Sequence, residues 1–382
     1  MQSLPPRPAW HNPYLALQLG LAALFGLLGL LVLFVLLVAT RGVVPFLLAT
    51  LASVLPVPIY ATLILWVDRH EKEPGWLLLS AFFWGSTVAV LFALVFNNLA
   101  GSILEALFGP LWALRFTIGV VAPVVEETAK GLALVGMAAF LRDEFDNLTD
   151  GLVYGALVGL GFGVAENVLY LGRAFAAGGF AALTLLFLVR VIVLGLMHSI
   201  WTGCTGAALG YAREHGGAAR FVAPPAGYLA AVFLHALWNS TNLGAEAMVG
   251  GRVLLLLPLL FGVILLPPLL LLGVLAFLAE RRERELVRTH LLDLVSAGIL
   301  TEDELRAAAT TRIKSRRLWE AFTRKGPRGW LVLRQFYDTV AELAFIRWRR
   351  SRSRPAGSDE DFLRQRLADL RSRLEALAIP WT

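Results

Sequence analysis

The chain has 382 residues, of which 57% are hydrophobic and only 16% are charged. Soluble domains carry about a quarter charged residues, so this composition excludes an ordinary water-soluble protein and requires a lipid bilayer to cover much of the apolar surface. The single cysteine, Cys204, excludes an intramolecular disulfide and a cysteine-based zinc site.

Long apolar stretches recur through the first 280 residues, and each is long enough to cross a bilayer as a helix, which takes about 20 residues. We therefore predict an all-α, polytopic membrane bundle of about eight spans in residues 1–280, followed by a soluble helical appendage in residues 281–382. The predicted spans are Tyr14–Ala39, Val43–Val67, Trp76–Leu99, Phe116–Leu141, Gly151–Leu171, Phe180–Ala212, Phe221–Leu243 and Val253–Ala279.

The net charge of +6 resides mostly in residues 281–382. A basic segment next to a span faces the cytoplasm and its anionic lipids, so we expect a lipid partner here and no nucleic acid. An even number of spans then places both termini in the cytoplasm. Within this tail, two capping boxes (Thr301 with Glu304, Ser358 with Asp361) predict helix starts. A leucine stripe predicts one packed helical face, formed by Leu363, Leu367, Leu370, Leu374 and Leu377.

Charged residues interrupt the fourth predicted span. Ionisable groups inside a span are costly unless they are paired or functional. Glu126 and Lys130 are four residues apart and share a helix face on which they could pair, whereas Glu127 points elsewhere. A pair that only ties helices together is the alternative interpretation of Glu126 and Lys130, but it leaves Glu127 unexplained.

The fifth predicted span combines small residues with a polar pair. Its glycines follow one another at four-residue intervals and predict a ridge that another helix can approach closely. These glycines are Gly151, Gly155, Gly159 and Gly163. Glu166 and Asn167 come directly after the ridge and would be pressed against that partner helix. The alternative is that Glu166 lies at the membrane edge and is merely solvated.

Two histidines fall deep in the sixth and seventh predicted spans. His198 shares a helix face with Thr202, and His235 shares one with Asn239. Each histidine could simply be packed in the core. Together with the glutamates, however, they supply what metal-assisted hydrolysis needs, because carboxylate and imidazole are standard zinc ligands. A further carboxylate can take a proton from water, and an amide can stabilise an oxyanion.

The motifs Glu126-Glu127-x-x-Lys130, Phe162-x-x-x-Glu166-Asn167, His198 and His235-x-x-x-Asn239 occur in this order. In these motifs the chain resembles the PrsW-type intramembrane protease family, over roughly residues 50–245. That family belongs to a superfamily with the CAAX prenyl proteases and the bacterial Abi membrane proteins. The resemblance implies a probable Zn²⁺ cofactor and hydrolysis of a peptide bond in a membrane-anchored protein substrate. It also suggests the first cut in an anti-sigma factor.

Site residues follow from the same resemblance, position by position. Either Glu126 or Glu127 would activate water, and Glu166 would be a further ligand or base. The implied catalytic residues are Glu126, Glu127, Glu166 and Asn239, and the implied metal ligands are Glu127, Glu166, His198 and His235.

Two other functions are compatible with polar groups in spans. One is a non-catalytic scaffold or chaperone, since the same superfamily is thought to include the scaffold subunit of gamma-secretase. The presence of both carboxylates and both histidines argues against it. The other is a proton-coupled transporter, and the lack of an evident internal repeat argues against that.

Overall fold

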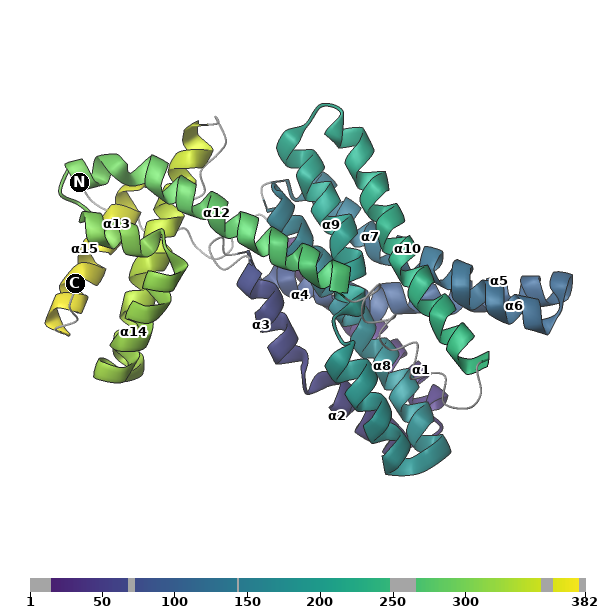
Figure 1. Cartoon of the computed structure of the whole chain (residues 1–382). Helices are drawn as coiled ribbons and strands as arrows, with labels where there is room; N and C mark the ends of the chain where they lie inside the picture. The colour runs from purple at the N-terminus through teal and green to yellow at the C-terminus, as the bar shows by residue number, and fades with distance from the viewer. Residues whose placement is uncertain (1–14, 68–72, 143, 248–265, 352–359, 378–382) are drawn as a thin grey trace. The chain divides into compact units, whose positions relative to one another are not determined.

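The computed structural model describes residues 15–67, 73–142, 144–247, 266–351 and 360–377, and these contain helices and no strand (Figure 1). The chain divides into two compact units. The first, called here the membrane unit, comprises Met1–Asp68 and Glu73–Leu271. The second, the C-terminal unit, comprises Leu272–Thr382 together with residues 69–72, which lie outside the described residues.

The membrane unit is built from helices that are often interrupted by π-helical turns. Its elements are α1 (Leu15–Ala39), α2 (Val43–Val54), α3 (Val57–Val67), α4 (Gly75–Phe83), η2 (Trp84–Ala89), α5 (Val90–Phe108), α6 (Pro110–Phe116), η3 (Thr117–Val121), α7 (Ala122–Phe140), α8 (Leu148–Leu186), η4 (Phe187–Val193), α9 (Met197–His215) and α10 (Ala219–Ala247). Local sequence explains several boundaries. Gly109 ends α5 with a φ of 79° and Pro110 begins α6, which is the usual placement of these two residue types.

Five helical stretches in the described part of the chain are long and apolar enough to cross a membrane. They are Leu15–Ala39, Val43–Val67, Gly75–Phe108, Leu148–His215 and Ala219–Thr241. The predicted number of about eight spans is therefore not confirmed. The predicted fourth span coincides with α7, which carries three charged residues and is not among the five. About half of the predicted eighth span, residues 253–265, lies outside the described residues, and the rest forms the first part of the helix Leu266–Ser296.

The 68-residue stretch Leu148–His215 contains both the fifth and the sixth predicted spans. Its helical conformation is broken at Gly178 and Gly179. At 1.5 Å per residue, a bilayer core of about 30 Å takes only about 20 helical residues, so the stretch is far too long for one crossing.

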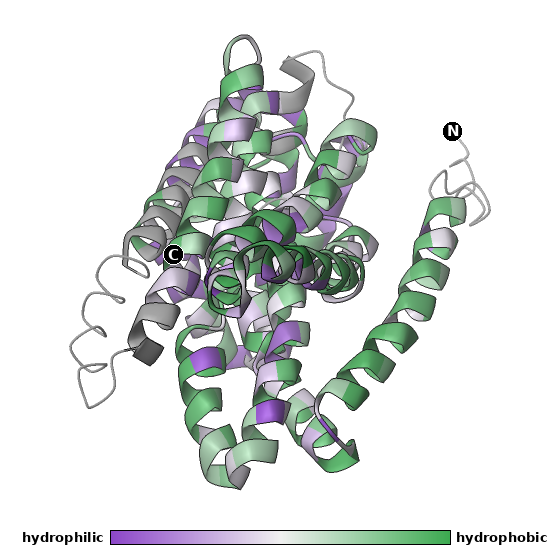
Figure 2. Cartoon of the chain, turned by 90° about the vertical axis from the view of Figure 1, so that its right-hand side faces the viewer, coloured by the Kyte–Doolittle hydropathy of each residue, from purple (hydrophilic) through white to green (hydrophobic). Residues whose placement is uncertain are grey.

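Apolar side chains cover the outside of the membrane unit. Leu27, Phe34 and Leu51 are examples of large hydrophobic residues with most of their surface exposed. Figure 2 shows α1, beside the N-terminal label, as hydrophobic along almost its whole length. Exposed apolar surface of this extent is stable in lipid and not in water.

Helix α8 is the centre of the membrane unit: α7 and α9 pack on it and on each other, and α10 packs on α9 and α7. The predicted glycine ridge is confirmed, because α8 meets the backbone of α9 along it. A Cβ atom on Gly151 would lie 2.0 Å from Gly206 O, and one on Gly159 would lie 2.2 Å from His198 O. Only residues without a side chain allow backbones to approach so closely.

The C-terminal unit has its own hydrophobic core. It contains α12 (Leu266–Ser296, which begins in the membrane unit), α13 (Glu302–Ala308), α14 (Thr311–Ser351) and α15 (Glu360–Ala376). The predicted capping box of Thr301 and Glu304 begins α13. The leucine stripe on α15 packs into the core as predicted, through Leu363, Leu367, Leu370, Leu374 and Leu377. The second predicted capping box involves Ser358, outside the described residues.

Candidate active site

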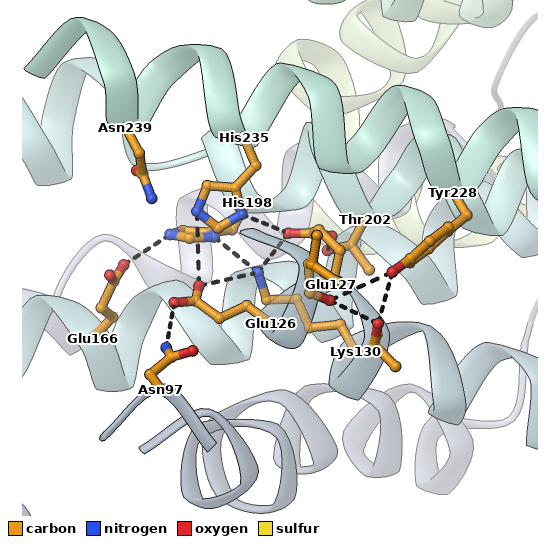
Figure 3. Close-up of polar contacts among 12 residues, drawn as sticks. Asn97, Glu126, Glu127, Lys130, Glu166, His198, Thr202, Tyr228, His235 and Asn239 are labelled. Atoms are coloured by element: carbon orange, nitrogen blue, oxygen red, sulfur yellow. Dashed lines mark hydrogen bonds and ion pairs between the residues drawn. The ribbon is translucent and has the colours of Figure 1, made fainter. Parts of the chain in front are cut away.

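The two adjacent glutamates on α7, Glu126 and Glu127, make different hydrogen bonds (Figure 3). Glu127 Oε1 accepts a hydrogen bond from Lys130 Nζ at 2.7 Å, and Oε2 accepts one from Thr202 Oγ1 at 2.9 Å. The expected pair of Lys130 with Glu126 is present but loose, with Nζ 4.0 Å from Glu126 Oε2. Glu127 is thus the main partner of Lys130, since residues three apart on a helix are neighbours as well as residues four apart.

The other glutamate, Glu126, has an oxygen atom without a hydrogen bond. Its Oε1 accepts from Asn97 Nδ2 on α5 at 3.3 Å, whereas Oε2 is buried and has no donor among the described residues. The nearest histidine nitrogen, His235 Nε2, is 3.7 Å from Oε2. A buried carboxylate oxygen without a donor is costly, so this atom points to a ligand that completes its contacts.

His235 is oriented by Glu127 and by an aromatic ring. Its Nδ1 atom is 3.1 Å from Glu127 Oε1 and donates to it, because a carboxylate only accepts. Nε2 is then left with its lone pair on the side of Glu126. Trp201 stacks on the imidazole with ring centroids 4.3 Å apart. This is the tautomer that a metal-binding histidine needs.

His198 lies between a cation and an anion. Lys130 Nζ is 3.0 Å from its Nδ1 atom, and Glu166 Oε2 is 2.8 Å from its Nε2 atom. An ammonium group has no lone pair, so Nδ1 accepts from Lys130 and Nε2 donates to Glu166. Both ring nitrogens therefore have partners.

Glu166 is held in place rather than merely solvated. Arg190, from the π-helical turn η4, places Nη2 2.5 Å from Glu166 Oε2 and donates from Nε to Asn167 Oδ1 at 2.9 Å. The same guanidinium lies over the ring of Tyr170, 3.8 Å from its centroid. Arg190 thus holds the Glu166-Asn167 motif from a second segment of the chain.

Asn239 lies one helical turn after His235 on α10, and Figure 3 shows its amide on the same side of that helix. Its Nδ2 atom donates to Ile118 O in the π-helical turn η3 at 3.0 Å. An amide nitrogen carries two N–H groups, so one remains for another acceptor. The predicted oxyanion donor is therefore close to the histidines.

The side chains of the cluster differ in how much of their surface is exposed. The side chains of Glu127 and Lys130 have no exposed surface, and that of His235 is 2% exposed. Glu166 and Arg190 are 19% and 20% exposed. The cluster is thus closed around Glu127 and more open beside Glu166.

Three residues of the cluster have the composition of a metal site. Glu126, His198 and His235 each offer one ligand atom, and these atoms all lie within 4.8 Å of one another. One carboxylate and two imidazoles are a donor set that zinc accepts, and the orphaned Glu126 Oε2 fits such an ion. The family resemblance had suggested Glu127 and Glu166 as carboxylate ligands. In the structure both oxygens of Glu127 are engaged, by Lys130 and Thr202, and Glu166 Oε2 is engaged by Arg190.

Some residues around the cluster were not predicted. Asn97 contacts Glu126 and Trp201 stacks on His235, and neither was singled out in the sequence. An amide pair, Asn97-Asn98, inside the third predicted span was the available signal. Trp201 gave no signal, because an aromatic residue in an apolar helix is ordinary.

The fold and this cluster define a helical membrane protein with a buried site of glutamates and histidines. The chain belongs to the PrsW family of intramembrane metalloproteases, whose sequence pattern it matches over residues 73–272. It is also similar to Protease PrsW of Bacillus subtilis (strain 168), with 32% identity over 111 residues, which is 27% of this chain and 44% of that relative. The chain thus matches less than half the length of this relative. No solved structure matches it.

Proposed function

We propose that the chain is a metal-dependent endopeptidase that hydrolyses a peptide bond of a membrane-anchored protein, with zinc as the metal. The observation that carries the proposal is the buried, unpartnered Glu126 Oε2 beside two histidines, in a chain of an intramembrane metalloprotease family. An anti-sigma factor is the proposed substrate, cut in the first of its proteolytic steps. Both termini are proposed to be cytoplasmic. The comparisons do not favour the scaffold or the transporter.

Glu126, His198 and His235 would hold the metal. Both ring nitrogens of His198 have other partners in the structure, so His198 would exchange its contact with Lys130 or with Glu166 for the ion. Bound zinc makes a water molecule acidic enough to ionise near neutral pH. Glu127 acts in this proposal as a positioning residue, because both of its oxygens are engaged: it fixes the tautomer of His235 and compensates the charge of Lys130. Its hydrogen bond to an imidazole N–H is the usual arrangement around a ligand histidine.

Glu166 is the proposed general base. It lies on the more open side of the cluster, where water and a peptide can reach it, and its Oε2 is already within hydrogen-bond distance of His198. It would accept the proton of the attacking water and pass it to the amine that leaves. Arg190 keeps this carboxylate ionised and oriented.

Asn239 is the proposed oxyanion donor. One N–H of its amide is anchored on Ile118 O, which fixes the side chain, and the second N–H would bind the carbonyl oxygen as it becomes negative. Donors that are fixed in advance are the effective ones, because they need no reorganisation during the reaction.

The proposal is tested with the full chain in liposomes and a single-pass substrate, by measuring metal content and cleavage together. Glu126→Gln, His198→Ala and His235→Ala are expected to lose both. Glu105→Gln and His215→Ala are matched controls, because both residues are exposed and lie outside the cluster. Wild-type protein that cleaves the substrate while it contains no metal would contradict the proposal, and so would cleavage at the wild-type rate in the three variants.

A further inference from the structure

The first half of α14, residues 311–328, is the most basic stretch of the C-terminal unit. It contains seven basic residues and one acidic residue, a net charge of +6. The only acid, Glu320, is paired with Arg316 at 2.9 Å. Gly326, with a φ of 68°, breaks the helix near the end of this stretch. We call residues 311–328 the basic aromatic segment.

Two aromatic side chains stand out from this segment. Trp319 is 66% exposed and Phe322 is 42% exposed, and their rings stack with centroids 5.9 Å apart. Large aromatic residues usually lie inside a protein or an interface, so an exposed pair among cations indicates a binding surface.

The exposed residues share one side of the helix. Arg312, Arg316, Trp319 and Thr323 follow at steps of four, three and four residues, which places them in one exposed row. The opposite side is occupied, because Ile313, Leu318 and Ala321 pack in the core of the C-terminal unit. Among the described residues, the row of cations and aromatics is therefore the exposed side of a helix whose other side is packed in the core.

We propose that the basic aromatic segment binds the anionic lipid surface of the membrane in which the chain is embedded. The cations complement acidic headgroups, and Trp319 with Phe322 suits the boundary between headgroups and acyl chains, where aromatic rings prefer to lie. An acidic peptide would satisfy the cations and leave the aromatic pair in water, whereas the bases of a single-stranded nucleic acid could stack on the pair, so RNA is an outcome of the test. The membrane unit anchors the chain in a bilayer, so lipid is always available to this segment. The proposal does not depend on peptidase activity.

The test uses the full chain in lipid nanodiscs, with Cys204→Ser to remove the native thiol and Thr323→Cys to carry an environment-sensitive fluorophore. Discs of neutral phosphatidylcholine are compared with discs containing phosphatidylserine, each with and without lipids that carry a quencher near the headgroup. We expect quenching in the anionic discs, little in the neutral discs, and its loss in about 1 M salt, where the Debye length falls to about 3 Å.

Two sets of variants separate the contributions. Trp319→Ala with Phe322→Ala should reduce the quenching, and Arg312→Gln, Arg316→Gln and Arg324→Gln together should abolish its dependence on anionic lipid. Matched controls in α15, Phe362→Ala and Arg373→Gln, also change exposed side chains and should have no effect. Ser315→Cys, at another exposed position of α14, provides a second label site in case Thr323→Cys disturbs the helix.

Three results would overturn the proposal. The first is a label that stays in water in both kinds of disc. The second is quenching that is equal in neutral and anionic discs and survives the triple charge variant. The third is binding of an RNA oligonucleotide or polyglutamate in neutral discs without any quenching by anionic lipid, which would assign the surface to a soluble polyanion.

Discussion

Lys130 Nζ and Glu127 Oε1 form an ion pair of 2.7 Å in which neither side chain has exposed surface. The ammonium also donates to His198 Nδ1 and lies 3.9 Å from the centroid of the Phe162 ring. Lys130→Met is therefore expected to destabilise the membrane unit, because removing one partner of a buried pair leaves an uncompensated charge at a cost of about 3–5 kcal/mol. Thermal unfolding in one detergent measures the loss.

The double variant Lys130→Met with Glu127→Gln is the control for this prediction. It removes both charges and should recover part of the lost stability. A single variant as stable as the wild type would mean that the pair contributes nothing to the fold.

The two adjacent glutamates should behave differently. Glu126→Gln is expected to abolish metal binding with little effect on stability, because the Oε2 atom that it replaces has no hydrogen bond to lose. Glu127→Gln should instead weaken metal affinity by about 10–100-fold through a loosened His235, and should also lower the unfolding temperature. Metal titration and thermal unfolding on the same samples check both. The division of roles fails if the two variants are indistinguishable.

The contact between α8 and α9 predicts a strong effect of one methyl group. Gly159→Ala places a Cβ atom against His198 O, so α9 must move and stability should fall by about 1–3 kcal/mol. Gly136→Ala on α7 is the matched control: no atom lies within 4 Å of its Cβ position, and alanine favours a helix over glycine by about 1 kcal/mol. Unfolding temperature and cleavage rate should both fall in Gly159→Ala, and neither should fall in Gly136→Ala.

The C-terminal unit should lose stability in acid. Burial tends to raise the pKa of Asp293 and of Glu360, but hydrogen bonds and charge from Arg347 outweigh it and lower both pKa values. A carboxyl group whose pKa is lower in the folded than in the unfolded chain stabilises the fold at pH values above its unfolded pKa, which is about 3.9 for Asp and about 4.3 for Glu. This stabilisation is lost as the pH falls through the lower pKa of the folded chain.

Urea unfolding of the full chain between pH 7 and pH 3 tests this, followed by the fluorine signal of 5-fluorotryptophan at the buried Trp348. Arg347→Met should flatten the pH dependence. Asp369→Asn is the control, because the pair of Asp369 with Arg373 is mostly exposed and should contribute little. An unchanged slope in Arg347→Met would contradict the assignment.

The sequence placed the motifs on helices, and these helices converge in the structure. Residues three or four apart share a helix face whatever surrounds them, so the local grouping of the motif residues was predictable. The sequence also predicted the glycine ridge and the leucine stripe, which are equally local. It could not decide that Lys130 pairs more closely with Glu127 than with Glu126, since that depends on Thr202 and His235 from other helices. Arg190 could not be matched to Glu166 either, because a π-helical turn changes the direction in which its side chain points.

The number of spans was harder to predict than the site. The three charges of α7 interrupt the apolar pattern of that helix, so composition alone does not show whether it crosses the membrane. The charges that obscure it are those of the candidate site. The charged residues of α7 that form the candidate site are thus the same ones that make its crossing of the membrane hard to predict.

The glycine contacts between α8 and α9 also bear on how a substrate can enter. Backbone meets backbone there, without side chains whose rotamers could change, so neither helix can slide or turn against the other without steric overlap. Glu166 and His198 therefore move as parts of one rigid pair. Any widening that admits a peptide chain must come from α7 or α5, which carry Glu126 and Asn97 and contact the pair through side chains, because α10 also meets the backbone of α9 closely, at Gly227.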